Sequence, residues 1–196
     1  MKMPDHPLKL IVGLGNPGPQ HDSNRHNAGV IFLHHLSKAY GGKLRGESKF
    51  FGEFTSINID GNDIKLLFPA TFMNHSGKSV ASVCKFFKIT PENMLVAYDE
   101  IDFDVGVTRF KEGGGHGGHN GIRDIINALG GKKEFFRLRI GVGHPGHKSM
   151  VSNYVLSDPS RSEADAIIRD IEDAIRVIPK AVTGEWEEAM RLLHTE

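Results

Sequence analysis

The chain has 196 residues, 39% of them hydrophobic, and its 24 basic side chains balance 24 acidic ones. This length suits one well-buried core better than two, so we expect a single domain over residues 1–196. Zero net charge excludes a protein that coats nucleic acid non-specifically, and the lack of a long apolar run excludes a membrane span. The single cysteine, Cys84, excludes an internal disulfide. Together with the lack of a signal peptide, it favours a cytoplasmic protein.

Strand-like and helix-like patterns alternate along the chain. Apolar runs predict strands at Leu8 to Val12, Phe51 to Ile59, Ile64 to Phe68, Met94 to Tyr98, Val107 to Lys111 and Arg137 to Val142. Helical spacing predicts helices at Ala28 to Tyr40, Ser76 to Phe87, Gly121 to Leu129, Glu163 to Ile178 and Thr183 to Leu193. This alternation predicts a single-domain α/β/α sandwich. The turn Ile59 to Asn62 joins two strands as a hairpin, so the twisted sheet should be mixed, though mostly parallel.

Two predicted helical regions carry clear apolar stripes. The last helical region of the chain contains Pro179, which is expected to split it into two helices. Its stripe should pack on the sheet and consists of Ile167, Ile168, Ile171, Ile175 and Ile178. Cys84 recurs at helical spacing with Val80, Val83 and Phe87, so we interpret it as a core residue rather than a nucleophile.

Charge is unevenly distributed along the chain. Residues 157–196 carry ten acidic and five basic side chains, so residues 1–156 carry a surplus of five positive charges. A local basic patch would attract a polyanion, but ordinary surface charge explains the difference equally well. Charge alone therefore identifies no partner.

A glycine-rich segment, Gly13 to Gly18, follows the first predicted strand, and the polar run Asn24 to Asn27 comes soon after. Its spacing matches the dinucleotide-binding fingerprint, which needs a helix directly after the third glycine and an acid about 20 residues later. Here the next helical pattern begins near Ala28, and no acid lies between Asp22 and Glu47. Loops that follow strands bind ligands in α/β folds, so we interpret this one as a reaction centre instead.

A second polar segment, Phe72 to Ser79, opens a predicted helix and ends like a phosphate-binding loop. That loop needs a glycine five residues before Gly77, where this chain has Phe72. Asn74 is therefore either a helix cap or a substrate contact.

Acidic residues cluster from Asp99 to Asp104, at the end of a predicted buried strand. A magnesium site, a solvated loop and a carboxylate that orients a histidine are all compatible with this pattern. The third role is the most economical, because a carboxylate beside an imidazole fixes its tautomer and raises its basicity.

The segment Lys111 to Gly121 contains six glycines among its last nine residues. Such a loop is tolerated where backbone must approach a ligand closely or move aside for it. His116 and His119 are possible metal ligands, but no third ligand stands at a convincing spacing. Asn120 is expected to cap the next helix.

Arg139 alternates with apolar neighbours, so its side chain should lie on the face opposite Leu138 and Ile140. An ion pair and an anion contact both remain open for it.

Taken together, these segments resemble the bacterial peptidyl-tRNA hydrolase family. The matching motifs follow one another in family order over about residues 8–156. They are Gly13 to Gly18, Arg25 to Gly29, Phe72 to Gly77, Asp99 with Glu100, Gly113 to Gly121 and Arg137 to Pro145. The resemblance implies a monomeric esterase without metal or cofactor. It would cleave the ester between a peptide and the 3′-terminal ribose of tRNA, recycle tRNA from aborted translation, and contact the acceptor stem and 3′ end.

The resemblance also implies roles for single residues. His26 matches the family's general base, and Asp99 matches the carboxylate that stabilises it. Asn16 matches the position that distinguishes N-blocked peptidyl-tRNA from free aminoacyl-tRNA. The other matches are substrate contacts at Phe72, Asn74, His119 and Asn120, and a pair that grips the tRNA 5′-phosphate, Lys111 and Arg139.

Two positions depart from the family pattern. His21 stands where the family usually has tyrosine, and Asn24 where it often has threonine. We expect the His21 imidazole to stack on the 3′-terminal nucleotide with less area than a tyrosine would offer.

The implied chemistry is consistent with the residues. An activated ester needs a positioned water, a base and donors for the oxyanion, which His26, Asp99 and the amides of Asn74 and Asn120 would supply. The chain contains no Gly-x-Ser-x-Gly elbow, and this absence weakens the interpretation as a serine esterase. A nucleotide-cofactor oxidoreductase and a non-catalytic RNA-binding module remain alternatives.

Overall fold

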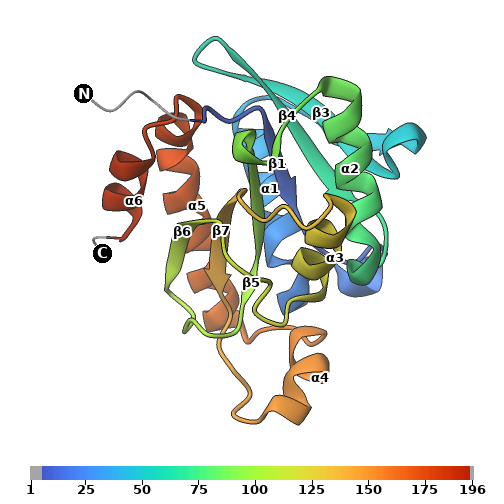
Figure 1. The fold of residues 1–196 in the computed structure, drawn as a ribbon. Coiled ribbons are helices and arrows are strands. Elements are labelled where there is room, and N and C mark those ends of the chain that lie inside the picture. The colour runs from blue at the N-terminus through green and yellow to red at the C-terminus, as the bar shows by residue number, and fades with distance from the viewer. Residues whose placement is uncertain (1–5, 195–196) are drawn as a thin grey trace.

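A computed structural model describes residues 6–194, which form a seven-stranded sheet in the order β2-β3-β4-β1-β5-β7-β6 (Figure 1). Four central strands are parallel neighbours: β4 (Asn62–Pro69), β1 (Leu10–Gly13), β5 (Met94–Glu100) and β7 (Phe136–Gly141). The outer pairings are antiparallel and involve β2 (Arg45–Glu47), β3 (Gly52–Ile59) and β6 (Thr108–Glu112). The sheet is therefore mixed, with a parallel centre, as predicted.

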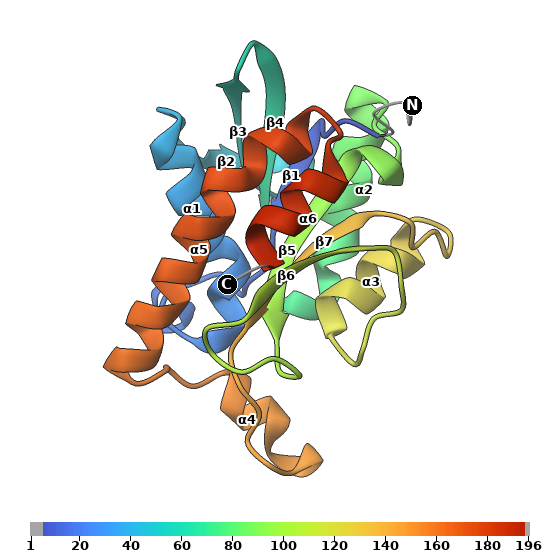
Figure 2. The same cartoon turned by 90° about the vertical axis from the view of Figure 1, so that its left-hand side faces the viewer.

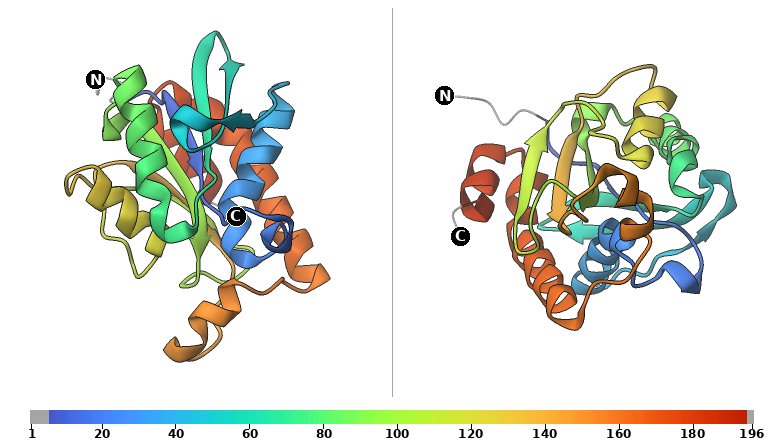
Figure 3. Two further views of the ribbon diagram at one scale, coloured as in Figure 1. Left: turned by 90° about the vertical axis from the view of Figure 1, so that its right-hand side faces the viewer. Right: turned by 90° about the horizontal axis from the view of Figure 1, so that it is seen from below.

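Helices cover both faces of this sheet. One face carries α1 (Ala28–Ala39), α5 (Arg161–Val182) and α6 (Trp186–His194), which lie in front in Figure 2. The opposite face carries α2 (Ser76–Phe87) and α3 (Asn120–Ala128), seen in the left view of Figure 3. The expected α/β sandwich is confirmed.

A short helix, α4 (Val151–Val155), lies beyond the edge at which β5 and β7 end (Figure 1). In the right view of Figure 3 it stands in front of that edge. Short 3₁₀ turns complete the chain: η1 (Pro19–His21), η2 (Arg25–Asn27), η3 (Ser48–Phe50), η4 (Met73–His75), η5 (Pro91–Asn93) and η6 (Lys148–Met150).

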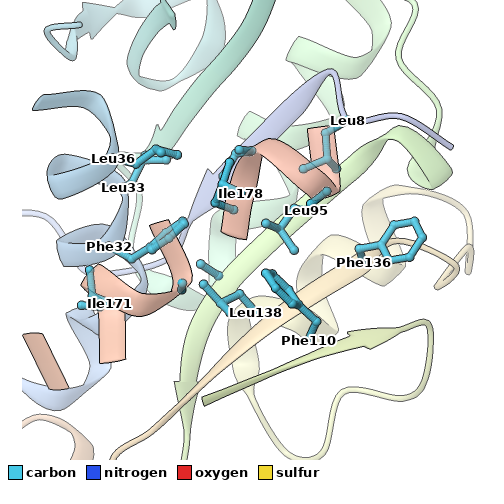
Figure 4. Packing of buried hydrophobic residues seen from close by; sticks show 14 of the residues in the cluster. Leu8, Phe32, Leu33, Leu36, Leu95, Phe110, Phe136, Leu138, Ile171 and Ile178 are labelled. Atoms are coloured by element: carbon cyan, nitrogen blue, oxygen red, sulfur yellow. The ribbon is translucent and has the colours of Figure 1, made fainter. Parts of the chain in front are cut away.

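The larger core lies between the sheet and α1, α5 and α6. Phe32 of α1, Ile171 and Ile178 of α5, and Leu138 and Phe110 of the sheet belong to one buried cluster, shown in Figure 4. The predicted isoleucine stripe thus faces the sheet, which confirms its interpretation. Burial of such side chains contributes roughly 1.5–3 kcal/mol each.

The second core lies beneath α2 and α3. Cys84 is buried in it, beside Val80 and Val83. Burial raises the pKa of the Cys84 thiol to about 11, so at neutral pH it is a protonated core side chain. The prediction that Cys84 belongs to the core is confirmed.

The hairpin between β3 and β4 forms at the predicted turn. Ile59 pairs with Asn62, and both central residues, Asp60 and Gly61, have positive φ angles of 51° and 86°. This is the left-handed pair that a two-residue hairpin turn requires.

Pro179 does not split the last helical region, so that prediction is wrong. Helix α5 continues through Pro179 to Val182. A proline removes one helical N–H donor, but Ala181 and Val182 beyond it are buried in the core and hold the last turn in place. The chain instead reverses at Thr183 and Gly184, where Gly184 adopts a φ of 80°.

The first glycine-rich loop leads into the irregular turn η1, and α1 begins only at Ala28. The dinucleotide fingerprint needs an α-helix directly after Gly18, but only the three-residue 3₁₀ turn η1 follows there, which confirms the interpretation against that fingerprint. Gly29 has another role: a Cβ there would lie 2.1 Å from the Ala97 carbonyl oxygen. Only glycine lets α1 approach β5 this closely, and that approach brings η2 to the end of β5.

Candidate active site

Two buried histidines and one buried carboxylate meet where β5 ends. His26 lies in η2, Asp99 lies at the end of β5, and His119 directly precedes α3. The Nδ1 atom of His26 lies 3.0 and 2.9 Å from the two carboxylate oxygens of Asp99. The Nε2 atom of His119 lies 2.9 Å from Oδ1 of the same carboxylate. Asp99 therefore bridges two imidazoles.

Helix α3 fixes the tautomer of His119. Its Nδ1 atom accepts hydrogen bonds from the backbone N–H groups of Gly121 and Ile122, at 3.1 and 3.3 Å. An accepting nitrogen carries no proton, so the neutral ring has its proton on Nε2 and donates it to Asp99. With Asp99 as the acceptor, His26 also donates from Nδ1, which leaves the Nε2 lone pair of His26 free as a base.

Electrostatics agrees with this assignment. Burial alone raises the pKa of Asp99, but the imidazoles of His26 and His119 more than reverse that effect and hold it well below its usual range. Burial lowers the pKa of His26, while the charge and hydrogen bond of Asp99 overcome this and raise it above 6.5. The carboxylate is thus ionised at neutral pH, and the imidazole is a stronger base than a free histidine.

Backbone and side-chain hydrogen bonds hold Asn16 in the same cleft as His26 and Asp99. Its backbone N–H donates to Oδ1 of Asn27 at 2.9 Å, and Nδ2 of Asn27 donates back to the Asn16 carbonyl at 3.0 Å. Its own Oδ1 accepts from the Met73 N–H at 2.7 Å. The Nδ2 group is therefore the part of the Asn16 amide left for a ligand.

A cleft of about 630 Å³ opens above these groups. Asn16, His26 and Asp99 lie at its base, and His119 lines it as well. Its outer wall includes Phe72, Asn74, His116 and Asn120, with Val151, Ser152, Val155 and Leu156 from α4 and the residue after it. Phe72 is 61% exposed. The cleft joins a buried polar base to an accessible apolar and amide-bearing mouth, as a ligand site requires.

The two predicted phosphate-binding cations lie outside the cleft. Lys111 of β6 and Arg139 of β7 share one sheet face with Arg109 and Arg137, because Arg109 pairs with Arg139 and Lys111 with Arg137. Arg139 lies opposite Leu138 and Ile140 as predicted, and binds Oε1 of Glu100 at 2.9 Å. Since Glu100 lines the cleft, it connects this basic face to the site.

His26, Asp99 and His119 form the one group among the described residues whose ligand atoms lie close enough to hold a metal ion. The hydrogen-bond pattern does not suit a metal, because His119 directs an N–H rather than a lone pair at Asp99. His116 is not in this group; its Nδ1 accepts from the Gly118 N–H.

The acidic residues from Asp99 to Asp104 do not gather at one point, since Glu100 pairs with Arg139 while Asp102 and Asp104 are exposed. Of the three proposed roles, the histidine-orienting carboxylate matches Asp99.

Other predicted site residues differ from expectation in detail. The cap of α3 is His119 rather than Asn120, whose Oδ1 accepts from Arg123. A histidine in place of the usual Ser, Thr, Asp or Asn hid this cap from the sequence. Both His119 ring nitrogens are engaged within the protein, so a substrate would meet its ring carbons.

His21 does not line the cleft. Its Nδ1 atom lies 2.9 Å from Nδ2 of Asn24, so the two residues that depart from the expected motif contact each other. Sequence reasoning also missed Asn27 and Arg25, although both flank His26 in the Arg-His-Asn triplet, which was the available signal.

Comparisons with known proteins agree on one family. The sequence profile described as peptidyl-tRNA hydrolase matches residues 10–196. A peptidyl-tRNA hydrolase of Saccharophagus degradans is 52% identical over the full length of both chains. One from Pseudomonas aeruginosa is 50% identical over 96% of this chain and 97% of its own. The crystal structure of peptidyl-tRNA hydrolase from Acinetobacter baumannii has a TM-score of 0.94 and 44% identity, over 100% of this chain and 97% of its own.

Proposed function

Because the chain belongs to the peptidyl-tRNA hydrolase family, a family of hydrolases that act on the ester bond of peptidyl-tRNA, we propose that His26 activates the attacking water. The observation that carries this proposal is the buried His26–Asp99 pair at the base of the cleft, with Nδ1 and carboxylate 2.9 Å apart. No other base in the cleft combines a carboxylate partner with a free imidazole nitrogen among the described residues.

The reaction needs one proton relay. The Nε2 atom of His26 takes a proton from a water molecule while the water oxygen bonds to the ester carbonyl carbon. The tetrahedral intermediate then breaks its bond to the 3′ ribose oxygen, and that oxygen takes the proton from Nε2. Asp99 stabilises the imidazolium that exists between these two steps, as a buried carboxylate does in a catalytic triad.

Amide groups around the cleft receive the substrate. Asn74 and Asn120 donate to the developing oxyanion, and their exposed positions at the mouth support contact with a bound ester. The free Nδ2 group of Asn16 binds the carbonyl of the amide that blocks the α-amino group. An unblocked amino acid has the ester carbonyl but lacks this amide carbonyl. Phe72 offers an exposed aromatic face to the substrate. His21, which lies outside the cleft lining, contributes a second ring for the 3′-terminal nucleotide.

The basic face of β6 and β7 binds the acceptor stem. Lys111 and Arg139 hold the 5′-phosphate there, and this assignment is supported by three accessible cations on one face, Arg109, Lys111 and Arg139. The fourth cation of that face, Arg137, is buried and donates to the backbone carbonyls of Gly114 and Gly115. Arg139 also pairs with Glu100, so the ion pair and the phosphate contact that the sequence left open are compatible.

We further propose that residues 1–196 act as one catalytic domain, as a monomer, in the cytoplasm. A continuous sheet and a cleft built within one chain support the first two statements. The tRNA substrate of the family supports the third. None of the described helices is long and apolar enough to cross a membrane.

The test is release of free tRNA from N-acetyl-aminoacyl-tRNA, with unblocked aminoacyl-tRNA as the control substrate. We expect rapid hydrolysis of the N-blocked ester and little hydrolysis of the free one. Binding of tRNA without turnover would instead identify an RNA-binding module, and equal hydrolysis of both esters would remove the role of Asn16.

A further inference from the structure

One side of the cleft is a segment with few attachments. Residues 144–157, which we call the α4 wall, contain η6 and α4 and contribute His144, Lys148, Val151, Ser152, Val155 and Leu156 to the cleft lining. Met150 and Leu156 on this wall are 54% and 44% exposed. A wall with so little buried surface needs another means of holding its position.

The hydrogen bonds that join the α4 wall to the rest of residues 6–194 all come from Arg25 and Tyr154. The guanidinium of Arg25 donates from Nη1 to the carbonyls of Tyr154 and Ser157, at 3.2 and 3.3 Å, and to the Ser157 hydroxyl at 2.5 Å. The Arg25 backbone N–H also donates to the Ser157 carbonyl, at 3.1 Å. The Tyr154 hydroxyl donates to the Val142 carbonyl at 2.7 Å.

The same guanidinium stacks on the wall. Its central carbon lies 4.0 Å from the centre of the Tyr154 ring, and its Nη2 atom lies 3.5 Å from Oε1 of Glu163. Arg25 is only 8% exposed. A planar fork that stacks on a ring and bonds two carbonyls at once has no equivalent in lysine. Burying this charge is costly unless its partners are in place, so the contact is specific rather than incidental.

Arg25 is also the residue directly before His26, in the same turn η2. The turn η2 therefore carries both His26, the proposed general base, and Arg25, which holds the α4 wall. The Arg25 side chain does not line the cleft, so it would act on a substrate only through the position of the wall.

We propose that Arg25 is a positioning residue that holds the α4 wall at the distance from His26 that peptidyl-tRNA requires. This inference rests on the proposed function for its kinetic consequence, but the anchoring itself is a property of the chain without substrate. Loss of the anchor widens the cleft and weakens substrate binding, while the His26–Asp99 pair stays intact.

The kinetic test uses Arg25→Lys, which keeps the charge but cannot reproduce the fork. We expect KM for N-acetyl-aminoacyl-tRNA to rise about tenfold, a typical result of losing hydrogen bonds to a charged group, with kcat changed less than threefold. The pH midpoint of kcat should not move. A shifted midpoint with a reduced kcat and an unchanged KM would overturn the proposal, because Arg25 would then act on the base itself.

The structural test is hydrogen exchange without substrate, so its result does not depend on activity. We expect amides of the α4 wall to exchange about tenfold faster in Arg25→Lys, while the core strands β1 and β5 keep their protection. Equal acceleration everywhere, or none in the wall, would contradict the proposal.

A milder variant keeps the inference testable if Arg25→Lys folds poorly. Ser157→Ala removes one of the bonds to Arg25, and should raise KM and wall exchange about twofold and add little to Arg25→Lys. Arg176→Lys, in an exposed ion pair with Asp173 on α5, is the matched control and should leave both readouts unchanged. Full additivity of Ser157→Ala with Arg25→Lys would show that the two residues act independently and would overturn the anchor.

Discussion

The base and the mouth of the cleft are built in opposite ways. The base comprises Asn16, His26 and Asp99, each at most 9% exposed and each bound by protein partners. The mouth comprises Phe72, Asn74 and Asn120, all exposed. Groups that change protonation are thus fixed before substrate arrives, while groups that meet a variable peptide keep their freedom. This difference indicates that the chemical step depends on side chains held in place before the substrate binds, whereas peptide binding depends on side chains that can adjust to the substrate.

Electrostatics makes the base of the cleft sensitive to single changes. Asp99 is a buried carboxylate that accepts hydrogen bonds from two imidazoles, and removing either imidazole takes one of these donors from a buried charge. The mouth has no such coupled group. Substitutions of His26 or Asp99 at the base should therefore lower kcat, whereas substitutions of Phe72 at the mouth or of the cations on the basic face should raise KM.

The largest effect is expected from His26→Ala. Without its base the enzyme should lose roughly 10²- to 10⁴-fold in kcat, the usual contribution of general-base catalysis. Turnover of N-acetyl-aminoacyl-tRNA at saturation measures this, with circular dichroism to verify the fold. A folded His26→Ala protein with near-normal kcat would eliminate the mechanism.

The next effect is expected from Asp99→Asn, which keeps a hydrogen bond but removes the charge. Since Asp99 holds the pKa of His26 above 6.5, the substitution should lower that pKa and move the acid limb of the kcat profile to lower pH. The plateau should fall about ten- to a hundredfold, because the imidazolium loses its counter-charge. A profile with an unchanged midpoint would show that Asp99 does not act through charge.

His119→Ala should affect stability as well as rate. The helix α3 loses its cap, which typically costs about 0.5–2 kcal/mol of unfolding free energy at neutral pH. The pKa of Asp99 should rise once one imidazole is gone. Its depressed pKa stabilises the fold above the unfolded pKa and this contribution disappears as pH falls, so the stability difference should shrink in acid.

Urea unfolding of His119→Ala at neutral and acidic pH measures this difference. His116→Ala, from the same glycine-rich loop, is the matched control and should unfold like the unmodified protein, since the only hydrogen bond of the His116 side chain among the described residues is to the nearby Gly118 amide. A difference that stays constant with pH would mean that the Asp99 contact contributes nothing.

Lys111→Ala should act on binding alone. Loss of one phosphate contact should raise KM for tRNA substrates about tenfold and reduce the slope of log KM against log salt by about one unit. Minimal substrates without a 5′-phosphate should be unaffected. Lys85→Ala, an exposed lysine on α2, is the control; equal losses for both variants would point to general charge rather than a phosphate site.

The smallest effect is expected from metal removal. His119 directs an N–H at Asp99, and His26 donates to the same carboxylate from Nδ1, so Asp99 is already satisfied by hydrogen bonds. Chelation should leave kcat unchanged once the tRNA is kept folded with a fixed magnesium concentration. Activity lost on chelation and restored by zinc alone would make the buried triad a metal site.

Most of the fold could be predicted from apolar patterning, and the exceptions have physical reasons. Strand β2 consists of Arg45, Gly46 and Glu47, which show no apolar alternation, and it exists only because it pairs with β3. Helix α4 has five residues and too few turns for a periodic signal. Pro179 ended a helix in the sequence reading, whereas burial of the following residues extends α5 in the structure.

The site was predictable only in part. The order of motifs identified His26 and Asp99 by resemblance, and the structure adds how they are held. The bond between Asn27 and Asn16, the cap at His119 and the clamp from Arg25 to Ser157 are tertiary contacts. The Arg25–Ser157 contact spans 132 positions in the chain, so no local spacing rule could reveal it.

The most direct measurement of the central claim, that an ionised Asp99 orients and strengthens His26 as the base, is a pH titration of the His26 ring nitrogens by ¹⁵N NMR. The account predicts that Nδ1 keeps its proton throughout and that Nε2 loses its proton with a midpoint above 6.5. A neutral ring with its proton on Nε2, or a midpoint below 6.5, would contradict the account.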